Sequence, residues 1–172
     1  YEGALTDFNE AIGLIPNVPD IIFFARGTAK YHLEDYEGAI SDYTKSIALD
    51  PNFADTYNNR GLGKYDLKDY KGAIADYDKA IYIDPNNALA YQNRGLAKGR
   101  LNDFEGAIAD LTKAIALDPN FAKAYYHRGL AKYYSGDKNG GCKDGRKAQE
   151  LGYDASIYSI SDVAAFIEAA CN

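Results

Sequence analysis

Few side chains in this sequence have the types and spacing that chemistry requires. His32 and His127 are the only histidines, and they lie far apart in the chain. Neither is accompanied by a Ser–Asp or Cys partner at a spacing that would bring a nucleophile and a base together. The glycine-rich stretch 136–145, GDKNGGCKDG, lacks the G-x-x-x-x-G-K-[ST] spacing of a phosphate-binding loop. We therefore expect no catalytic residue, no metal site and no cofactor, and the chain is not predicted to be an enzyme.

The elements that position these residues follow a repeat of 34 residues. The stretch 54–87 matches 20–53 and 88–121 when it is moved by one period. Asp-Pro and Arg-Gly pairs keep this step, at Asp50-Pro51, Asp84-Pro85 and Asp118-Pro119 and at Arg26-Gly27, Arg60-Gly61, Arg94-Gly95 and Arg128-Gly129. A fixed period of this length is typical of a solenoid, in which each unit buries its apolar face only against its neighbours.

Each copy of the repeat contains two amphipathic stretches joined by a turn. In the copy 54–87, Ala73, Tyr77 and Ala80 follow the i, i+4, i+7 spacing of a helix with one buried stripe. Asp69 is predicted to cap the start of this helix, because its short carboxylate can accept a free backbone N–H. Pro85 is predicted to stop the helix, because proline cannot continue the hydrogen-bond ladder. Equivalent Asp residues stand at Asp35, Asp103 and Asp137.

This pattern resembles the tetratricopeptide repeat. The family signature of an aromatic, Leu-Gly, Tyr, Ala, an aromatic, Ala and Pro corresponds here to Tyr57, Arg60-Gly61, Lys64-Tyr65, Ala73, Tyr77, Ala80 and Pro85. Arg60 in place of Leu and Lys68 in place of a turn glycine depart from it. The resemblance covers residues 1 to about 152. It implies an all-α fold, a right-handed superhelical solenoid of antiparallel helix pairs with a C-terminal capping helix.

The resemblance further implies one solenoid over residues 1–172. We divide it into the second helix of a truncated repeat (1–17), repeats at 20–53, 54–87 and 88–121, a degenerate repeat (122–155) and a capping helix (159–171). The sequence starts at Tyr1 in mid-pattern and contains no Met. We interpret it as part of a longer protein, and its N-terminus does not predict a compartment.

One Arg and one Asp recur in each copy and suggest a structural pair. Arg60 and Asp76 belong to the first and second helices of the same copy. A carboxylate can bind the planar guanidinium through two parallel hydrogen bonds. We expect these residues to join the paired helices and not to contact a ligand.

The two cysteines are candidates for a disulfide. Cys142 takes the position that Ile74 holds in an earlier copy, and Cys171 lies on the apolar face of the predicted capping helix. If that helix packs on the glycine-rich stretch, the sulfurs of Cys142 and Cys171 meet. The alternative is two free thiols, with Cys142 acting as a small buried hydrophobic residue.

Positions that differ between copies identify the candidate binding surface. On the first helices these positions and their neighbours share one helical face: Phe24, Tyr31, Asn58, Asn59, Leu62, Tyr65, Gln92, Asn93, Leu96, Arg100, Lys123, Tyr126, His127 and Tyr133. In the family that the sequence resembles, this face lines a concave groove that holds an extended peptide or a partner helix. Asn59 and Asn93 are expected to bind a peptide backbone, since an amide both donates and accepts. The alternative is that these side chains are only solvated.

Composition narrows the class of partner. The formal net charge is −6 and the pI is about 4.9, which argues against a nucleic-acid or anionic-membrane surface. No apolar run is long enough for membrane insertion. We therefore predict a protein-interaction scaffold that binds a peptide or protein partner in the groove. The alternative is self-association by end-to-end stacking through Leu5, Phe8 and Ile12.

Overall fold

All regular secondary structure that the computed structural model describes is α-helical. The model describes residues 1–153 and 171. Its helices are α1 (Glu2–Leu14), α2 (Asp20–His32), α3 (Tyr36–Leu49), α4 (Ala54–Asp66), α5 (Tyr70–Ile83), α6 (Ala88–Arg100), α7 (Phe104–Leu117), α8 (Ala122–Tyr134) and α9 (Lys138–Glu150). The predicted all-α class is confirmed.

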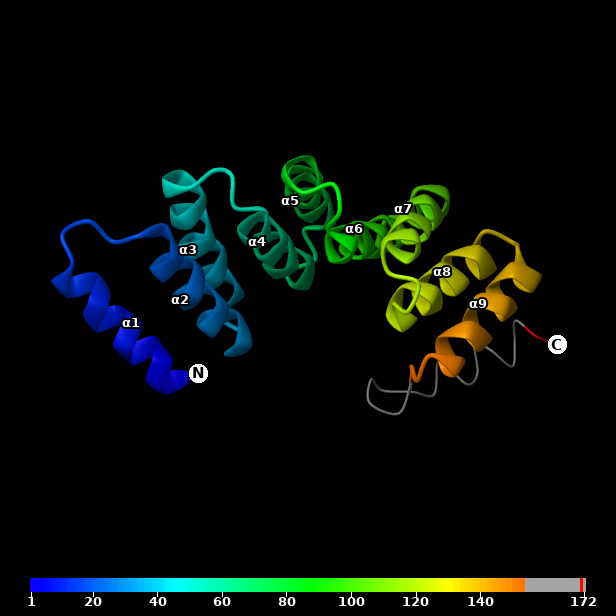
Figure 1. Cartoon of the computed structure of the whole chain (residues 1–172), viewed down its shortest axis with the longest axis horizontal. Helices are drawn as coiled ribbons and strands as arrows, with labels where there is room; N and C mark the ends of the chain where they lie inside the picture. Colours follow the sequence, from blue (N-terminus) through cyan, green and yellow to red (C-terminus); the bar gives the residue numbers. More distant parts are fainter. Residues whose placement is uncertain (154–170, 172) are drawn as a thin grey trace. The chain divides into compact units, whose positions relative to one another are not determined.

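The chain divides into two compact units, Tyr1–Pro85 and Asn86–Asn172. In the first unit, α1 to α5 pack one against the next; in the second, α6 to α9 do the same (Figure 1). Within each unit the consecutive helices form the antiparallel pairs that are typical of a tetratricopeptide solenoid. The first helix of one pair also touches the first helix of the next, as α2 touches α4 and α6 touches α8.

The second helix of each pair begins at an aspartate cap. The carboxylate of Asp69 accepts a hydrogen bond from the backbone N–H of Gly72 at 2.9 Å, which satisfies one of the free donors of the first turn. A Cβ on Gly72 would lie 2.0 Å from the Asp69 carboxylate, so any larger residue here would make the Asp69 side chain shift. Asp35, Asp103 and Asp137 form the same bond, as the sequence predicts.

Small residues let the paired helices approach closely. A Cβ on Gly61 of α4 would lie 2.6 Å from the Tyr77 ring of α5. Ala73 of α5 is fully buried. The turn between these helices places Lys68 at a φ of 65°, in the left-handed region where glycine is usual. The departure noted at Lys68 therefore keeps the turn and accepts some strain in the backbone.

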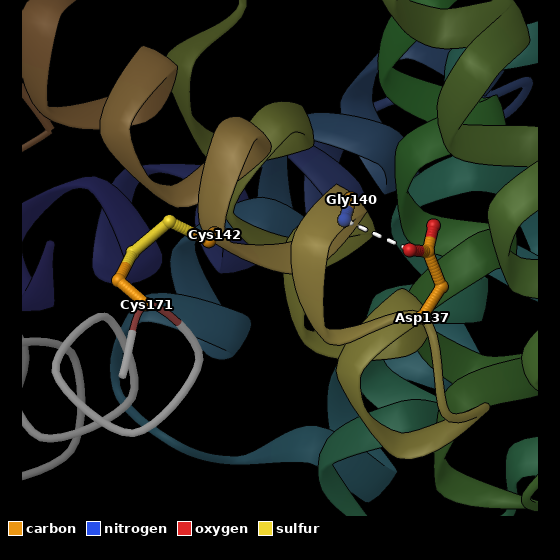
Figure 2. The surroundings of a disulfide bond; sticks show 4 residues. All are labelled: Asp137, Gly140, Cys142 and Cys171. Atoms are coloured by element: carbon orange, nitrogen blue, oxygen red, sulfur yellow. Dashed lines mark hydrogen bonds between the residues drawn. A yellow bond between two sulfur atoms is a disulfide. The ribbon is translucent and has the colours of Figure 1, made fainter.

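The predicted capping helix 159–171 lies, apart from Cys171, outside the described residues. Cys171 is bonded to Cys142 of α9, with a Cα–Cα distance of 5.1 Å (Figure 2). The two cysteines that the bond joins are 29 positions apart in the sequence. Asp137 and Gly140 form the cap at the beginning of the same helix.

Candidate functional site

The recurring arginines form ion pairs inside the helix pairs. Arg60 donates from Nε and Nη2 to the two carboxylate oxygens of Asp76, at 2.9 and 2.6 Å. The expected Arg–Asp pairing is thus confirmed. Lys64 is a third member, which the sequence pattern did not predict, and its Nζ atom lies 2.7 Å from the same carboxylate. Equivalent triads are Arg26, Lys30 and Asp42, then Arg94, Lys98 and Asp110, and Arg128, Lys132 and Asp144.

Three of these arginines, Arg26, Arg60 and Arg128, also reach the preceding repeat. Arg60 Nη1 donates to Thr44 Oγ1 at 3.1 Å, and Arg26 Nη1 donates to Asn9 Oδ1 at 2.9 Å. Burial alone would raise the pKa of Asp42, but the hydrogen bonds and charges of Arg26 and Lys30 outweigh burial and lower it. Arg26, Arg60 and Arg128 therefore each join three helices through their guanidinium groups.

The predicted site residues of the first unit lie on α2 and α4. We call the surface that these two helices share the first face. Phe24 is part-buried between Tyr43 and Phe53, with ring centroids 6.0 and 5.1 Å away. Asn58 is buried and donates from Nδ2 to the Asn59 Oδ1 at 3.3 Å. The remaining members are part-exposed and comprise Tyr31, Asn59, Leu62 and Tyr65. A ligand on this face would meet these part-exposed side chains before Asn58.

A tyrosine–aspartate pair joins the two helices of the first face. Tyr31 donates its hydroxyl to Asp66 Oδ2 at 2.6 Å, and its ring packs on Tyr36 with centroids 5.4 Å apart. Burial and then the bond to Asp66 raise the pKa of Tyr31. Asp66 is exposed and is absent from the site residues predicted above. The available signal was variation between copies, because the equivalent positions hold His32, Arg100 and Tyr134.

The predicted site residues of the second unit lie on α6 and α8, which we call the second face. Gln92, Asn93 and Tyr126 are buried. Neither the oxygen nor the nitrogen of the Gln92 amide has a hydrogen-bond partner within the described ranges. Four further members are more accessible: Leu96, Lys123 and Tyr133 are part-buried and Arg100 is exposed. The second face thus combines a buried polar layer with a part-buried lysine, Lys123, and an exposed arginine, Arg100.

His127 completes the second face as a neutral imidazole. Its Nε2 atom is buried and unpartnered in the part of the chain that the structure describes. Burial, followed by the charges of Lys123 and Arg100, lowers the pKa of His127 to about 3. Two repeats earlier the equivalent Asn59 side chain hydrogen-bonds the Tyr43 hydroxyl.

The repeat explains why His127 lacks such a bond. Tyr43 donates its hydroxyl to Thr28 Oγ1 at 3.2 Å. Two repeats later these two positions hold Leu111 and Leu96, which offer no polar atom to an imidazole. The polar network of the first unit is therefore replaced by an apolar one in the second, and the imidazole stays uncharged.

Residues 1–153 and 171 contain neither a metal-binding cluster nor a membrane-spanning helix. No group of three His, Cys, Asp or Glu side chains there lies close enough to hold a metal ion. No described helix has the length and apolar character needed to cross a membrane.

Antiparallel helix pairs in a 34-residue period, joined by internal charge triads, define a helical-repeat protein. Models described as "TPR repeat" match residues 27–63 and 100–136, and models described as "Tetratricopeptide repeat" match 54–87 and 76–109. The chain belongs to the tetratricopeptide-repeat family, a scaffold family that is typically non-catalytic. Curated protein sequences gave no match.

Solved structures share the fold over most of the chain. MamA (41-end) from Desulfovibrio magneticus RS-1 is 27% identical, with a TM-score of 0.81 over 87% of this chain and 84% of that chain. The first TPR of Spaghetti (RPAP3), bound to the HSP90 peptide SRMEEVD, is 25% identical, with a TM-score of 0.66 over 66% and 90%. The second TPR domain of human RPAP3, in complex with the HSP70 peptide SGPTIEEVD, is 28% identical, with a TM-score of 0.62 over 69% and 95%.

Proposed function

We propose that this chain is a protein-interaction module that binds an extended peptide or a partner helix on its first and second faces. The observation that carries this proposal is that constant and variable positions of the repeat have different environments. Residues that are constant between copies, such as Arg60 and Asp76, are engaged in internal contacts. Residues that differ between copies, such as Asp66 and Arg100, are exposed on the first helices. A partner can therefore reach these exposed positions, whose side chains vary from copy to copy.

The two faces differ in charge, so each would favour a different kind of ligand side chain. The first face carries the exposed carboxylates of Asp55 and Asp66. The second face carries Arg100 and Lys123, whose charges both lower the pKa of His127. Electrostatic complementarity of this kind directs specificity and association rate. Tyrosines on both faces add the residue type that is enriched in binding hot spots.

The relatives support a peptide as the ligand. Two structures with this fold, the TPR domains of RPAP3, contain bound HSP90 and HSP70 peptides. Some family members clamp a C-terminal carboxylate with a set of Lys, Asn and Arg side chains. In this chain only Asn93 and Lys123 fit that set. We therefore propose a peptide ligand of a different sequence from those tails.

The test is selection of binders from a library of random peptides, followed by fluorescence anisotropy. Arg100→Glu changes the second face, and Lys113→Glu, an exposed residue of α7 on a second helix, is the matched control. We expect Arg100→Glu to weaken binding about tenfold or more and Lys113→Glu to change it less than about twofold. Equal affinity of the two variants, or a library that yields no binder, would contradict the proposal.

Self-association is the second candidate. Leu14 at the end of α1 is 73% exposed, and Ile15 and Ile21 nearby are also exposed. Leu5, Phe8 and Ile12 are only part-buried. An apolar group of this kind favours contact with another solenoid. Sedimentation velocity at several concentrations tests it, and a concentration-independent monomer would remove this candidate.

A further inference from the structure

We propose that α1 is a docking surface for a basic amphipathic helix that carries the sequence Arg-Gly-x-x-Lys. The surface consists of Ala4, Asp7, Phe8 and Ala11, and we call it the α1 face. It lies on a different helix from the first and second faces, so this inference goes beyond the proposed function. The contacts of the complete helix pairs indicate what this face binds.

The helix α1 has the sequence and the packing of a second helix. The sequences of α1 and α3 align without a gap, and both contain Glu-Gly-Ala-x-x-Asp. Arg26 of α2 donates to Asn9 of α1 at 2.9 Å. At the corresponding positions one repeat later, Arg60 of α4 donates to Thr44 of α3 at 3.1 Å. Therefore α1 packs on α2 as α3 packs on α4 (Figure 1).

The α1 face is uncovered, whereas the same face of α3 is buried under α2. The equivalent residues of α3 are at most 1% exposed, and they are Ala39, Asp42, Tyr43 and Ser46. On α1, by contrast, Ala4 and Asp7 are exposed, and Phe8 and Ala11 are only part-buried. No residue of α1 is buried by the part of the chain that the structure describes. The helix therefore presents a pairing face that none of the described helices occupies.

Asp7 gives this face its charge. Its equivalent Asp42 binds an Arg and a Lys of α2, but the side chain of Asp7 forms no ion pair or hydrogen bond with any described residue. Lys45 lies 3.9 Å from the Asp42 carboxylate, and the equivalent residue on α1 is Glu10. Residues 1–19 contain three acidic side chains and no Lys or Arg. A basic partner is therefore complementary in charge to the α1 face.

The complete pairs show which cations satisfy such an aspartate. Arg60 donates to both carboxylate oxygens of Asp76, at 2.9 and 2.6 Å. Lys64, one turn later on α4, places Nζ 2.7 Å from the same carboxylate. Two parallel bonds from a guanidinium are stronger than bonds between neutral groups. A helix with Arg and Lys four positions apart would give Asp7 the same two partners.

The glycine of the sequence allows the helices to approach. A Cβ on Gly61 of α4 would lie 2.6 Å from the ring of Tyr77, and one on Gly27 of α2 would lie 2.9 Å from the ring of Tyr43. Phe8 is the equivalent aromatic residue on α1. A partner with a larger residue after its arginine would meet the Phe8 ring before the arginine reached Asp7.

The partner must come from outside residues 1–172. The helices α2, α4, α6 and α8 carry Arg-Gly-x-x-Lys, but each already binds the aspartate of its own pair. Residues 151–172 contain no Lys or Arg. A second copy of the chain would offer the same engaged helices, so it would leave Asp7 without a cation. The α1 face is therefore suited to a separate basic helix and not to a second copy.

The test is fluorescence anisotropy of a labelled peptide titrated with the chain. The peptide is ALAYQNRGLAKGR, the sequence of α6, blocked at both ends. One control peptide carries Arg94→Gln with Lys98→Gln, which removes both cations, and another carries Gly95→Val, which blocks close approach. In the chain, Asp7→Asn removes the charge of the α1 face, and Glu2→Gln removes an equal charge from an exposed site on the same helix. Circular dichroism verifies that each chain variant folds.

We expect saturable binding of the α6 peptide with a Kd on the order of 100 μM, since the peptide must also fold into a helix. Asp7→Asn and each control peptide should weaken binding about tenfold or more, and Glu2→Gln less than about twofold. Hydrogen exchange should slow in α1 when the peptide is bound, because a covered helix opens less often.

Equal affinity of the Asp7→Asn and Glu2→Gln chains, equal affinity of the three peptides, or slowed exchange confined to helices other than α1 would overturn the proposal. So would absence of peptide binding together with self-association that Glu2→Gln retains and Asp7→Asn abolishes, because the α1 face would then bind a second copy. The proposed function is tested separately, since peptides selected on the first and second faces should bind the Asp7→Asn chain unchanged.

Discussion

Replacement of Asp42 by Asn examines whether the charge triads hold the helix pairs together. Asp42 is fully buried and accepts two hydrogen bonds from Arg26, at 2.7 and 2.6 Å, and lies 2.8 Å from Lys30 Nζ. Asn keeps the shape but removes the charge, and it leaves two cations without their counter-ion. Breaking a buried ion pair costs about 3–5 kcal/mol. The Arg26 and Lys30 side chains keep 12% and 19% exposure, so water offsets part of that cost, and we expect about 3 kcal/mol.

The assay is urea unfolding followed by circular dichroism, with hydrogen exchange locating the loss in α2 and α3. Glu37→Gln is the matched control, because it removes an equal charge from an exposed site on the same helix, and we expect a change of at most about 1 kcal/mol. Replacing Arg26, Lys30 and Asp42 together by Leu should recover most of the loss, since no unpaired charge then remains. Equal stability of Asp42→Asn and Glu37→Gln would refute this account of the triads.

The triad also predicts a dependence on pH. The folded chain lowers the pKa of Asp42 below its value in the unfolded chain, about 3.9. The stabilisation is therefore complete above that pH and is lost as the pH falls toward the folded value. The difference in unfolding free energy between wild type and Asp42→Asn should shrink below about pH 4. A difference that is unchanged down to pH 2 would contradict the assignment.

Three further predictions concern packing, titration and the disulfide. Gly61→Ala should destabilise the folded chain by about 1–3 kcal/mol, because the new Cβ meets the Tyr77 ring. Gly99→Ala has open space around it and should stabilise the folded chain by about 0.5–1 kcal/mol. Urea unfolding of the two variants measures both changes. His127 has a pKa of about 3 in the folded chain, below its value in the unfolded chain. Its contribution to the free energy of unfolding is therefore complete above about pH 6.5 and falls by up to about 1.4 kcal/mol per pH unit below that pH. The stability of wild type minus His127→Asn, measured against pH, should show this slope, and a flat difference would contradict it. Cys142→Ser should cost about 3 kcal/mol by opening a loop of 29 residues, seen as a lower Tm than that of the oxidised wild type.

Elements that depend on local sequence could be predicted. The caps at Asp69 and its equivalents follow from side-chain chemistry within one turn, and the structure shows their bonds. The Arg60–Asp76 pair followed from one opposite charge per helix at a constant spacing. Lys64 was missed because one Arg for each Asp already gives the carboxylate a partner, whereas the lysine side chain is long enough to reach Asp76 from the next turn of α4.

The burial of individual side chains could not be predicted in the same way. Helical spacing assigns Gln92 and Asn93 to one face, but both are buried, because α6 packs against α7 as well as α8. His127 lacks a hydrogen bond because Leu111 takes the position that Tyr43 holds beside Asn59 two repeats earlier, and this correspondence needs the repeat geometry. The Tyr31–Asp66 bond likewise joins helices of different repeats. Such contacts need the positions of three helices at once.

The most direct test of the proposed interaction module is to locate a bound peptide on the described helices. A peptide selected from the random library, carrying a nitroxide spin label, is added to the ¹⁵N-labelled chain, and the broadening of each amide signal is measured. Binding on the first and second faces predicts broadening in α2, α4, α6 or α8, with exposed amides of α3, α5 and α7 unaffected. Broadening confined to α3, α5 and α7 would contradict the account.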